Sequence, residues 1–316
     1  MNAAVVHSFD TPPRYDSFAD PIAAEGEALV TVAAAGLHQI VKSLAKGTHY
    51  GSAGVLPFIP GVDGVGRLED GARVYFGAAR SPFGSLAERS ITSRAFSFPL
   101  PGALDDATAA GIANPGMSSW AALKLRAHLT AGESVLILGA TGVAGRLAIQ
   151  IAKRLGASRV VAAGRNAEAL AQLTDLGAET VIPLQQEHDA LVSAFREEKC
   201  DVVLDYVWGA PAESLIEAIS QKGLQHASSR IRYLQVGSTA GPKISLPAEA
   251  LRSSGLELLG SGFGSVPIEL ILRSVSEFFA EAARKPFQFN LRTAALRDVE
   301  KLWNSHEQGA RLVFQP

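Results

Sequence analysis

The stretch from Val135 to Asn166, VLILGATGVAGRLAIQIAKRLGASRVVAAGRN, constrains the fold of this chain more than any other part of it. It holds an apolar run, a glycine-rich turn, a helical pattern and a second apolar run from Val160 to Ala163. A strand, a tight turn, a helix and a second strand in this order are typical of the first half of a dinucleotide-binding fold. The stretch therefore predicts a parallel sheet with a nucleotide site at its edge.

Small residues stand in the turn where a dinucleotide-binding loop needs them. Ala140 replaces the first glycine of the general pattern, and Gly142 and Gly145 supply the other two. The helix that follows would direct free N–H groups and its positive end at a pyrophosphate. The alternative is an ordinary tight turn. The residues expected to contact the cofactor here are Ala140, Thr141, Gly142, Val143 and Ala144.

The end of the second apolar run indicates the phosphate form of the cofactor. About 20 residues after the turn, the motif expects an acid that binds the ribose hydroxyls of NAD, and here the chain has Gly164, Arg165 and Asn166. Gly164 removes a carboxylate that would repel a 2′-phosphate, and Arg165 offers a planar set of donors suited to phosphate. We therefore predict NADP(H) at these three residues. The alternative is that Arg165 is a solvated surface arginine.

Composition limits the class of protein. Of 316 residues, 47% are hydrophobic and 19% are charged, and the formal net charge is −2. No nucleic-acid partner is expected, because such a partner needs a basic patch. The longest uncharged run, Ala107 to Leu123, contains proline, glycine and two serines, so we expect no membrane segment. Asp10 and Arg14 stand where a signal peptide needs apolar residues, and we expect a cytoplasmic protein.

The chain divides into two regions of different pattern. Up to about residue 100, short apolar runs alternate with proline and glycine, which is typical of a small β-barrel or sandwich. After Leu104, apolar runs alternate with helical patterns, which is typical of a parallel sheet covered on both faces. Asp105 and Asp106 are expected to open an Ala-rich helical stretch, and Asn114 is then interpreted as a helix cap, with Pro115 at the first helical position. The final segment, ARLVFQP, is expected to be a strand that returns to the first domain.

Six strands and four helices are expected in the second region, which matches the two mononucleotide halves of a doubly wound fold. The expected strands are 134–138, 159–163, 180–182, 201–205, 232–236 and 256–260. The expected helices are 143–155, 167–176, 188–198 and 211–221, and a further helical stretch runs from Val266 to about Arg284.

With these residues placed, the chain resembles the medium-chain dehydrogenase/reductase superfamily, and within it the zinc-independent quinone oxidoreductase group. The resemblance implies a chaperonin-10-like β-barrel domain at 1–110, completed by 285–316, and a Rossmann NADP-binding domain at 111–284. It also implies a homodimer that pairs through an edge strand, for which LELLGSGF at 256–263 is the candidate. The likeness rests on AAVVHSF near the start, PGVDGVG at 60–66, ATGVAG at 140–145, DVVLDYVWG at 201–209 and the glycine in QVGS.

Two positions argue against a catalytic metal. Alcohol dehydrogenases of this superfamily have a cysteine just after the third strand-like run and a Gly-His-Glu in a later turn. Here the first place reads Gly36-Leu37-His38-Gln39 and the second reads Gly61-Val62-Asp63. Leucine and valine cannot coordinate zinc, and a catalytic zinc needs three protein ligands. We therefore expect no metal.

Without a Lewis acid, the enzyme needs an acceptor that is already electrophilic. The resemblance implies quinones or α,β-unsaturated carbonyls, which take hydride at carbon. Tyr50 is the candidate proton donor or carbonyl anchor, although His49 occupies the position closer to the family spacing and either residue is a candidate to face the substrate. His38 and Gln39 are expected to line the substrate side, and Asp63 is expected to hold its turn.

The remaining candidates belong to the nicotinamide end of the cofactor. Ser118 or its neighbour Ser119 is expected at the carboxamide or ribose, where relatives often have threonine, with helix capping as the alternative. Gly237 and Ser238 follow the fifth strand, where ligands gather. Phe263 is a candidate to close over the ring.

Three other functions compete with NADPH-dependent reduction of quinones or enones. A short-chain reductase needs a Tyr-x-x-x-Lys pair, and none of the five tyrosines has it. A non-catalytic NADPH-binding sensor or structural protein stays open, because a fold does not fix a function. A metal-free alcohol or aldehyde reductase would need donors for a localised alkoxide, and the sequence identifies none.

Overall fold

The computed structural model describes residues 1–52, 54–220, 229–262, 264–305 and 309–316. The chain forms two compact units. The first contains Met1–Pro115, Val275–Pro286 and Asn290–Pro316, and the second contains Gly116–Ser274 with Phe287–Phe289. The division differs from the expected boundaries mainly in giving the C-terminal half of the long helix near residue 280 to the first unit.

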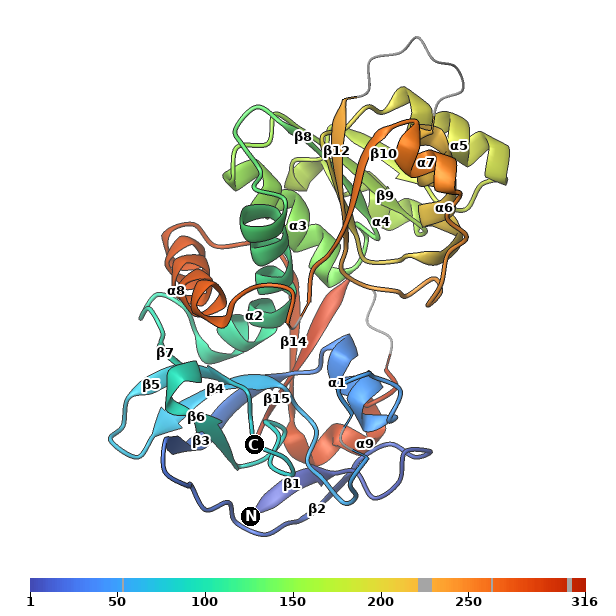
Figure 1. Ribbon diagram of the computed structural model, residues 1–316. Coiled ribbons are helices and arrows are strands. Elements are labelled where there is room, and N and C mark those ends of the chain that lie inside the picture. Colours follow the sequence, from blue (N-terminus) through green and yellow to red (C-terminus); the bar gives the residue numbers. More distant parts are fainter. Residues whose placement is uncertain (53, 221–228, 263, 306–308) are drawn as a thin grey trace. The chain divides into compact units, whose positions relative to one another are not determined.

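The second unit is built on a six-stranded sheet in which every described pair of neighbours is parallel (Figure 1). Its strand order is β10-β9-β8-β11-β12-β13, so the order of the chain reverses between β8 and β11. This is the doubly wound order of a Rossmann sheet, and the predicted fold class is confirmed. The strands are β8 Ser134–Leu138, β9 Arg159–Gly164, β10 Thr180–Pro183, β11 Val202–Asp205, β12 Arg230–Gln235 and β13 Gly255–Gly260.

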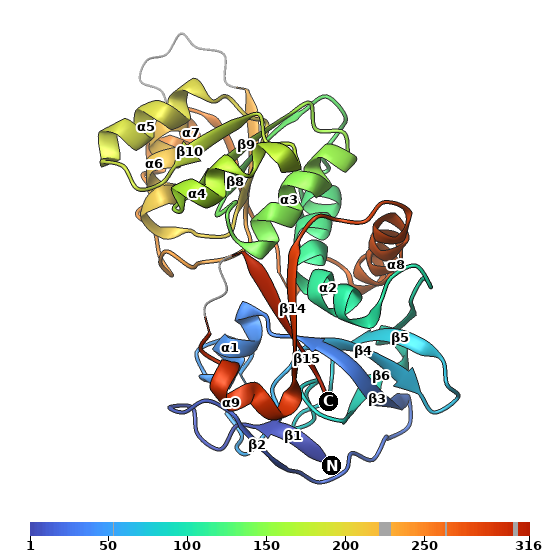
Figure 2. The same cartoon turned by 180° about the vertical axis from the view of Figure 1, so that it is seen from behind.

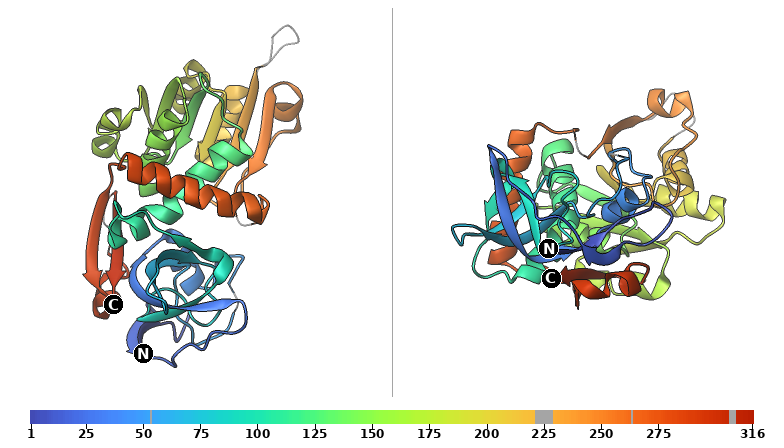
Figure 3. Two further views of the ribbon diagram at one scale, coloured as in Figure 1. Left: turned by 90° about the vertical axis from the view of Figure 1, so that its left-hand side faces the viewer. Right: turned by 90° about the horizontal axis from the view of Figure 1, so that it is seen from below.

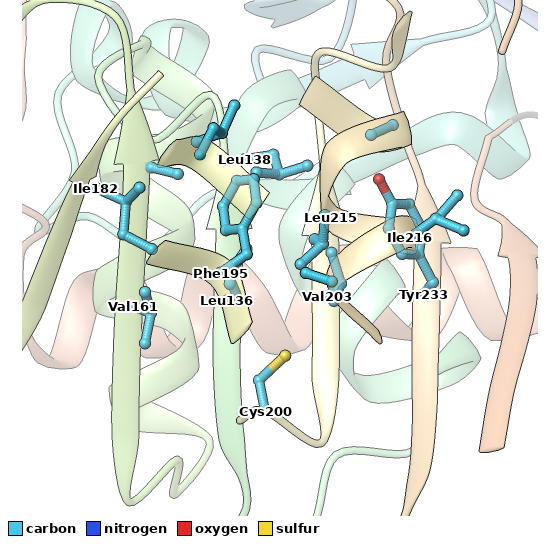
Figure 4. Packing of buried hydrophobic residues seen from close by; sticks show 14 of the residues in the cluster. Leu136, Leu138, Val161, Ile182, Phe195, Cys200, Val203, Leu215, Ile216 and Tyr233 are labelled. Carbon is cyan, nitrogen blue, oxygen red and sulfur yellow. The ribbon is translucent and has the colours of Figure 1, made fainter. Parts of the chain in front are cut away.

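Apolar side chains on one face of this sheet pack against α5 (His188–Glu197) and α6 (Gly209–Ile219). Leu136 and Val203 come from the strands, while Phe195 and Leu215 come from the helices, and all four are buried (Figure 4). The strands β8 and β9 are apolar on both faces because helices cover both, which explains the unbroken runs that identified them in the sequence.

The opposite face of the sheet is covered by α3 (Val143–Arg154), which contacts β8 and β9, and α4 (Ala167–Ala171) lies beside β9 and β10 (Figure 2). Because side chains alternate along a strand, Val135 and Ile137 point away from the cluster that contains Leu136. The helix predicted at 167–176 is broken into α4 and a 3₁₀ turn at Thr174–Leu176. A short helix, α7 (Ala248–Arg252), precedes β13.

The first unit is a β domain that includes both chain termini (Figure 3). One sheet runs β14-β15-β3-β4-β5-β7, with β6 paired to β3, and β1 pairs with β2. The C-terminal strand β15 joins β3, so the predicted return of the chain is confirmed. The strands are β1 Asn2–Val5, β2 Arg14–Ser17, β3 Glu27–Gly36, β4 Asp63–Leu68, β5 Arg73–Gly77, β6 Arg89–Ser93, β7 Ser97–Pro99, β14 Asn290–Ala295 and β15 Ala310–Gln315.

The core of the β domain lies between these strands and the short helices α1 (Gln39–Ala45) and α9 (Val299–Leu302). Trp303, Phe76 and Phe314 are its large buried side chains. This arrangement agrees with the chaperonin-10-like domain that the resemblance implied.

The predicted helix start at Pro115 is wrong. Helix α2 runs without interruption from Asp106 to Ala121, with Pro115 inside it, and continues as a π-helical turn over Ala122–Arg126. The helix begins where the sequence predicted a helical stretch to open, and its cap is Asp105, whose Oδ1 accepts the Thr108 N–H at 2.8 Å. An internal proline costs a helix one hydrogen bond, and burial of residues such as Ile112 and Trp120 offsets that cost.

The long helix expected after Val266 is present as α8, Ile268–Arg284. None of the helices in the described ranges has the length and apolar content that a transmembrane span requires.

Candidate nucleotide and substrate sites

The glycine turn lies at the carboxyl edge of the Rossmann sheet. Leu138 is level with Ala163 of β9 and with Asp205 of β11, so the ends of these strands meet at one edge. Gly139 follows with φ +87°, a conformation that favours glycine. The N–H groups of Gly139 and Ala140 both donate to the Ala163 carbonyl at 2.9 Å, which fixes the turn to the neighbouring strand.

The two motif glycines have different surroundings. A Cβ atom on Gly145 would overlap Gly139 O and Ala140 Cα, so this glycine is required for the close approach of helix and turn. A Cβ atom on Gly142 would meet only Gly139 O, at 3.5 Å. Gly142 is exposed and is the N-cap of α3, whose first amides have no acceptor within the helix. The turn therefore leaves open space at the helix end, which suits a pyrophosphate.

Thr141 lies against the end of β9. A Cβ atom on Gly164 would lie 2.6 Å from Thr141 Cγ2 and 3.0 Å from its Oγ1. Gly164 is thus a steric requirement of the turn, in addition to lacking the carboxylate that the general motif has at this point. The side chain of Thr141 is half-buried as a result.

Arg165 is exposed and lines an open depression together with Asn166, Ala167 and Gln185. Asn166 caps α4, since its Oδ1 accepts the Ala169 N–H at 2.9 Å. Asn166 was predicted to bind the cofactor, and this hydrogen bond occupies the Oδ1 atom of its side chain. Gln185 was not identified from the sequence, although it follows β10, and the end of a neighbouring parallel strand is where such a residue is expected.

Among the residues predicted at the nicotinamide end, Gly237 is held by two hydrogen bonds. The Gly237 N–H donates to the Asp205 carbonyl at 3.1 Å, and the Gly237 carbonyl accepts from Gln235 Nε2 at 3.0 Å. Ser238 is exposed. Ser118 is half-buried on α2, and its neighbour Ser119 is fully buried. Phe263 lies outside the described residues.

In the β domain, His38 and Asp63 lie side by side in the core. His38 is 1% exposed and Asp63 is 3% exposed. His38 Nε2 is 3.2 Å from Asp63 Oδ1, but the atoms are not aligned for a hydrogen bond. Tyr75 Oη donates to Asp63 Oδ2 at 2.9 Å. Burial lowers the pKa of His38, an effect that outweighs the attraction of the Asp63 carboxylate. Asp63 thus holds two strands together, because Tyr75 lies on β5.

Beside this pair is a small cavity of about 80 Å³, lined in part by Gln39, Lys42 and Arg311. Arg311 Nη1 donates to the Leu37 carbonyl at 2.7 Å, and burial lowers the pKa of Arg311 to about 10. The pKa of Lys42 is also lowered, by burial and by the nearby Lys46 and Arg311. The cavity is therefore basic. Gln39, predicted to line the substrate side, is on its exposed rim.

The rings of Tyr50 and His49 are in contact, tilted by 32°, on the loop after α1. Their ring centroids are 4.1 Å apart, and Tyr50 is 80% exposed. The Gly51 N–H donates to His49 Nδ1 at 3.0 Å, so the neutral ring has its hydrogen on Nε2. Burial lowers the pKa of His49, which favours this neutral form. Both residues thus offer a hydrogen-bond donor, the phenol of Tyr50 and the Nε2–H of His49.

No group of three His, Cys, Asp or Glu side chains among the described residues is arranged to hold a metal ion. Leu37 and Val62 provide no ligand atoms beside His38 and Asp63, which leaves this place short of the three protein ligands that a catalytic zinc needs.

Comparison with known proteins agrees with this geometry. Residues 144–281 match the family described as zinc-binding dehydrogenase. The chain is 30% identical, over 362 aligned positions and the whole of both proteins, to the probable NADPH-dependent quinone reductase tdiC of Emericella nidulans. It is 29% identical, over 205 positions, to the chloroplastic NADPH-dependent alkenal/one oxidoreductase of Arabidopsis thaliana, with 58% of this chain and 50% of that protein covered.

A solved structure supports the same relationship. The quinone oxidoreductase from Thermus thermophilus, also solved in complex with NADPH, superposes with a TM-score of 0.80 and 25% identity over all of both chains. The strand order, the glycine turn and the full-length similarity have one explanation: the chain belongs to the quinone oxidoreductase group of the medium-chain dehydrogenase/reductase superfamily.

Proposed function

We propose that this chain reduces quinones or α,β-unsaturated carbonyls with NADPH and without a catalytic metal. The observation that carries the proposal is the open space at Gly142, where the end of α3 meets the glycine turn. The names of the relatives, an NADPH-dependent quinone reductase and an NADPH-dependent alkenal/one oxidoreductase, support the cofactor and the class of acceptor.

Residues of the turn and of the β9 end would hold the cofactor. The backbone from Ala140 to Ala144 would bind the pyrophosphate through the free amides of α3. Arg165 would bind the 2′-phosphate, because it is exposed in an open depression that has no carboxylate among its lining residues. Gln185, in the same depression, would add an uncharged donor.

The chemistry then divides between cofactor and protein. When bound, the reduced nicotinamide supplies hydride, and the protein supplies position and electrostatics. An enone or quinone accepts hydride at carbon and develops negative charge on a carbonyl oxygen. A donor that hydrogen-bonds this oxygen lowers the barrier. We assign that role to Tyr50, with His49 Nε2–H as the neighbouring donor, and the expected lining to His38 and Gln39.

Activity can be tested by following NADPH oxidation at 340 nm with a panel of quinones, enones, saturated ketones and aldehydes. We expect turnover with the first two classes, a preference for NADPH over NADH, and no effect of a chelator. Turnover confined to saturated ketones or aldehydes, or loss of activity with removal of a stoichiometric metal, would contradict the proposal.

The second candidate is an NADPH-binding sensor or structural protein without turnover. It is favoured by the exposure of Tyr50, whose hydroxyl has no hydrogen-bond partner among the described residues. Calorimetric titration separates the two functions. Tight NADPH binding with no oxidation by any acceptor in the panel would support the sensor.

We also propose a cytoplasmic homodimer. Strand β13 is at the edge of the Rossmann sheet, and its outer backbone groups are available for pairing. Light scattering coupled to size-exclusion chromatography would detect the dimer. A charged substitution in the middle of this strand, Leu258→Lys, would be expected to shift it toward monomer.

A further inference from the structure

Tyr206 lies at the carboxyl edge of the Rossmann sheet, where the strand order reverses. It directly follows β11, which pairs with β8 at the point where the strand order reverses. In open parallel sheets, ligands bind outside the strand ends at such a reversal. Because Arg165 lies beyond β9 on the other side of β8, the adenosine end of a cofactor belongs on that side. The nicotinamide end therefore belongs on the side of β11 and β12, where Tyr206 lies.

Two glycines surround the backbone of Tyr206. A Cβ atom on Gly139 would lie 3.3 Å from Tyr206 Cβ, and a Cβ atom on Gly237 would lie 2.8 Å from the Tyr206 carbonyl oxygen. The turn itself is fixed by Asp205, whose Oδ1 accepts the N–H groups of Val207 and Trp208 at 2.7 and 2.9 Å. Tyr206 thus has a large side chain in a defined position, and the two residues beside it, Gly139 and Gly237, have no side chain.

The hydroxyl of Tyr206 belongs to a cluster of three. Tyr206 Oη is 2.6 Å from Ser119 Oγ on α2, and Ser118 also hydrogen-bonds the phenol. Burial raises the pKa of Tyr206 to about 12, and the two serines oppose that rise only in part. The phenol consequently keeps its proton at neutral pH and acts as a hydrogen-bonding group rather than as a base. Tyr206 and Ser118 are partly buried, and Ser119 is fully buried.

A primary carboxamide complements such a cluster. In a pair of hydroxyls, one hydrogen lies between the two oxygens, and the remaining hydrogen and lone pairs are directed elsewhere. A carboxamide both accepts at its carbonyl and donates from its NH₂ group, so it matches the cluster whichever hydroxyl is the donor within the pair.

We infer that Tyr206, together with Ser118 and Ser119, binds the carboxamide of the nicotinamide ring and so determines how the ring is oriented. This inference rests on the proposed function, and it adds Tyr206 as a residue that selects the cofactor by its carboxamide. A purely structural role, in which the hydroxyls only join α2 to β11, predicts a different response to changes in the ligand.

The experiment compares NADPH with its 3-acetylpyridine analogue, in which a methyl ketone replaces the carboxamide. Wild-type protein, Tyr206→Phe, Ser119→Ala and the double variant are titrated with both ligands. Tyr15→Phe, a change at a half-exposed tyrosine on β2 of the other unit, is the control. A fragment without nicotinamide, 2′-phospho-ADP-ribose, reports on the adenosine end alone.

We expect wild type to bind NADPH more tightly than the analogue. Tyr206→Phe should reduce that ratio about five- to tenfold, the effect of losing one hydrogen bond, while affinity for 2′-phospho-ADP-ribose stays unchanged. Ser119→Ala should reduce the ratio of the two affinities less, and the double variant should have the same ratio as Tyr206→Phe. The smaller Ser119→Ala change serves as the test if Tyr206→Phe does not fold.

An unchanged ratio in Tyr206→Phe and Ser119→Ala would overturn the inference, including the case in which NADPH and its analogue weaken equally. That result leaves the proposed function intact as long as wild type oxidises NADPH. Failure of wild type to bind NADPH at all would overturn the proposed function as well.

Discussion

The side chain of Thr141 lies where a side chain on residue 164 would need to be. A Cβ atom on Gly164 would come within 2.6 Å of Thr141 Cγ2, at the point where the turn after β8 contacts the end of β9. Gly164 therefore has two consequences. It leaves out the negative charge of the acid that the general motif has, and it makes room for the turn.

This relationship predicts a compensating pair of changes. Gly164→Ala should destabilise the protein by about 1–3 kcal/mol, the usual cost of overpacking, and should weaken NADPH binding because the turn shifts. Thr141→Ser removes the closest methyl group and should restore part of both losses in the double variant. Urea denaturation and calorimetric titration measure the two effects. Additive losses in the double variant would show that the two residues do not compete for space.

The two glycines of the turn offer a matched comparison. Gly142→Val should fold with nearly wild-type stability, because its Cβ atom meets only one backbone oxygen at 3.5 Å. It should bind neither NADPH nor NADH, since the added side chain occupies the space at the helix end. Gly145→Val should instead destabilise the fold strongly, because its Cβ atom overlaps Ala140.

Thermal unfolding and cofactor titration of both variants check this prediction. Normal cofactor binding by Gly142→Val would mean that the pyrophosphate lies elsewhere.

The alternation of strands and helices was predictable because helices cover both faces of the sheet, which makes its central strands continuous apolar runs such as Val135–Leu138. The second helix start predicted at Pro115 was wrong because proline is a local signal. Pro115 stays within a helix whose residues Ile112 and Trp120 are buried, and that burial is not visible in the local sequence.

Some residues of the site could not be predicted from the sequence because they come together through contacts between distant parts of the chain. Gln185 and Tyr206 lie at the nucleotide edge because β10 and β11 end there. Tyr206 is part of DVVLDYVWG, but that stretch served only as a mark of the family and gave the tyrosine no role. His38 and Asp63 are 25 positions apart and meet only through the pairing of β3 with β4. Asp63 was expected to hold its turn, and in the structure the bond from Tyr75 joins it to β5 instead.

Arg165 is predicted to distinguish the two cofactors. Arg165→Ala should weaken NADPH binding by about 1.5–3 kcal/mol, the value of a hydrogen bond to a charged group, and should leave NADH binding almost unchanged. Arg94→Ala, which removes an exposed arginine from the β domain, is the matched control. Dissociation constants for both cofactors decide the matter. An equal loss for both would assign Arg165 to a general role in the turn.

Tyr50 is predicted to act on the acceptor and not on the cofactor. Tyr50→Phe should lower kcat/KM for enones by about 100-fold or more, the lower range for a positioned proton donor, with unchanged affinity for NADPH. His49→Gln should have the smaller effect if Tyr50 is the donor, and the larger one if the Nε2–H of His49 is the donor instead.

Tyr15→Phe serves again as the control, and steady-state kinetics with one quinone and one enone give the comparison. Wild-type rates in both Tyr50→Phe and His49→Gln would remove the pair from the mechanism.

Buried His38 is predicted to make folding stability depend on pH in the mildly acidic range. Its pKa is lowered in the folded state by burial, so below about pH 6.5, the ordinary value for histidine, the unfolded chain takes up a proton that the folded chain does not. Stability is therefore full above that pH and falls as the pH decreases toward the folded-state pKa. The slope is up to about 1.4 kcal/mol per pH unit for each such histidine.

Urea denaturation at several pH values between 7.5 and 5.5 measures this slope. His38→Asn should flatten it, whatever its effect on stability at pH 7.5, because the variant has no ring to protonate. His128→Asn is the matched control, since His128 is exposed and has φ +50°, which asparagine tolerates. His49, whose pKa is also lowered by burial, should account for the slope that remains. A His38→Asn protein with the wild-type slope would show that His38 has the same pKa in the folded and unfolded chains. A steeper slope in the variant would show that folded His38 is held protonated by the Asp63 carboxylate 3.2 Å away.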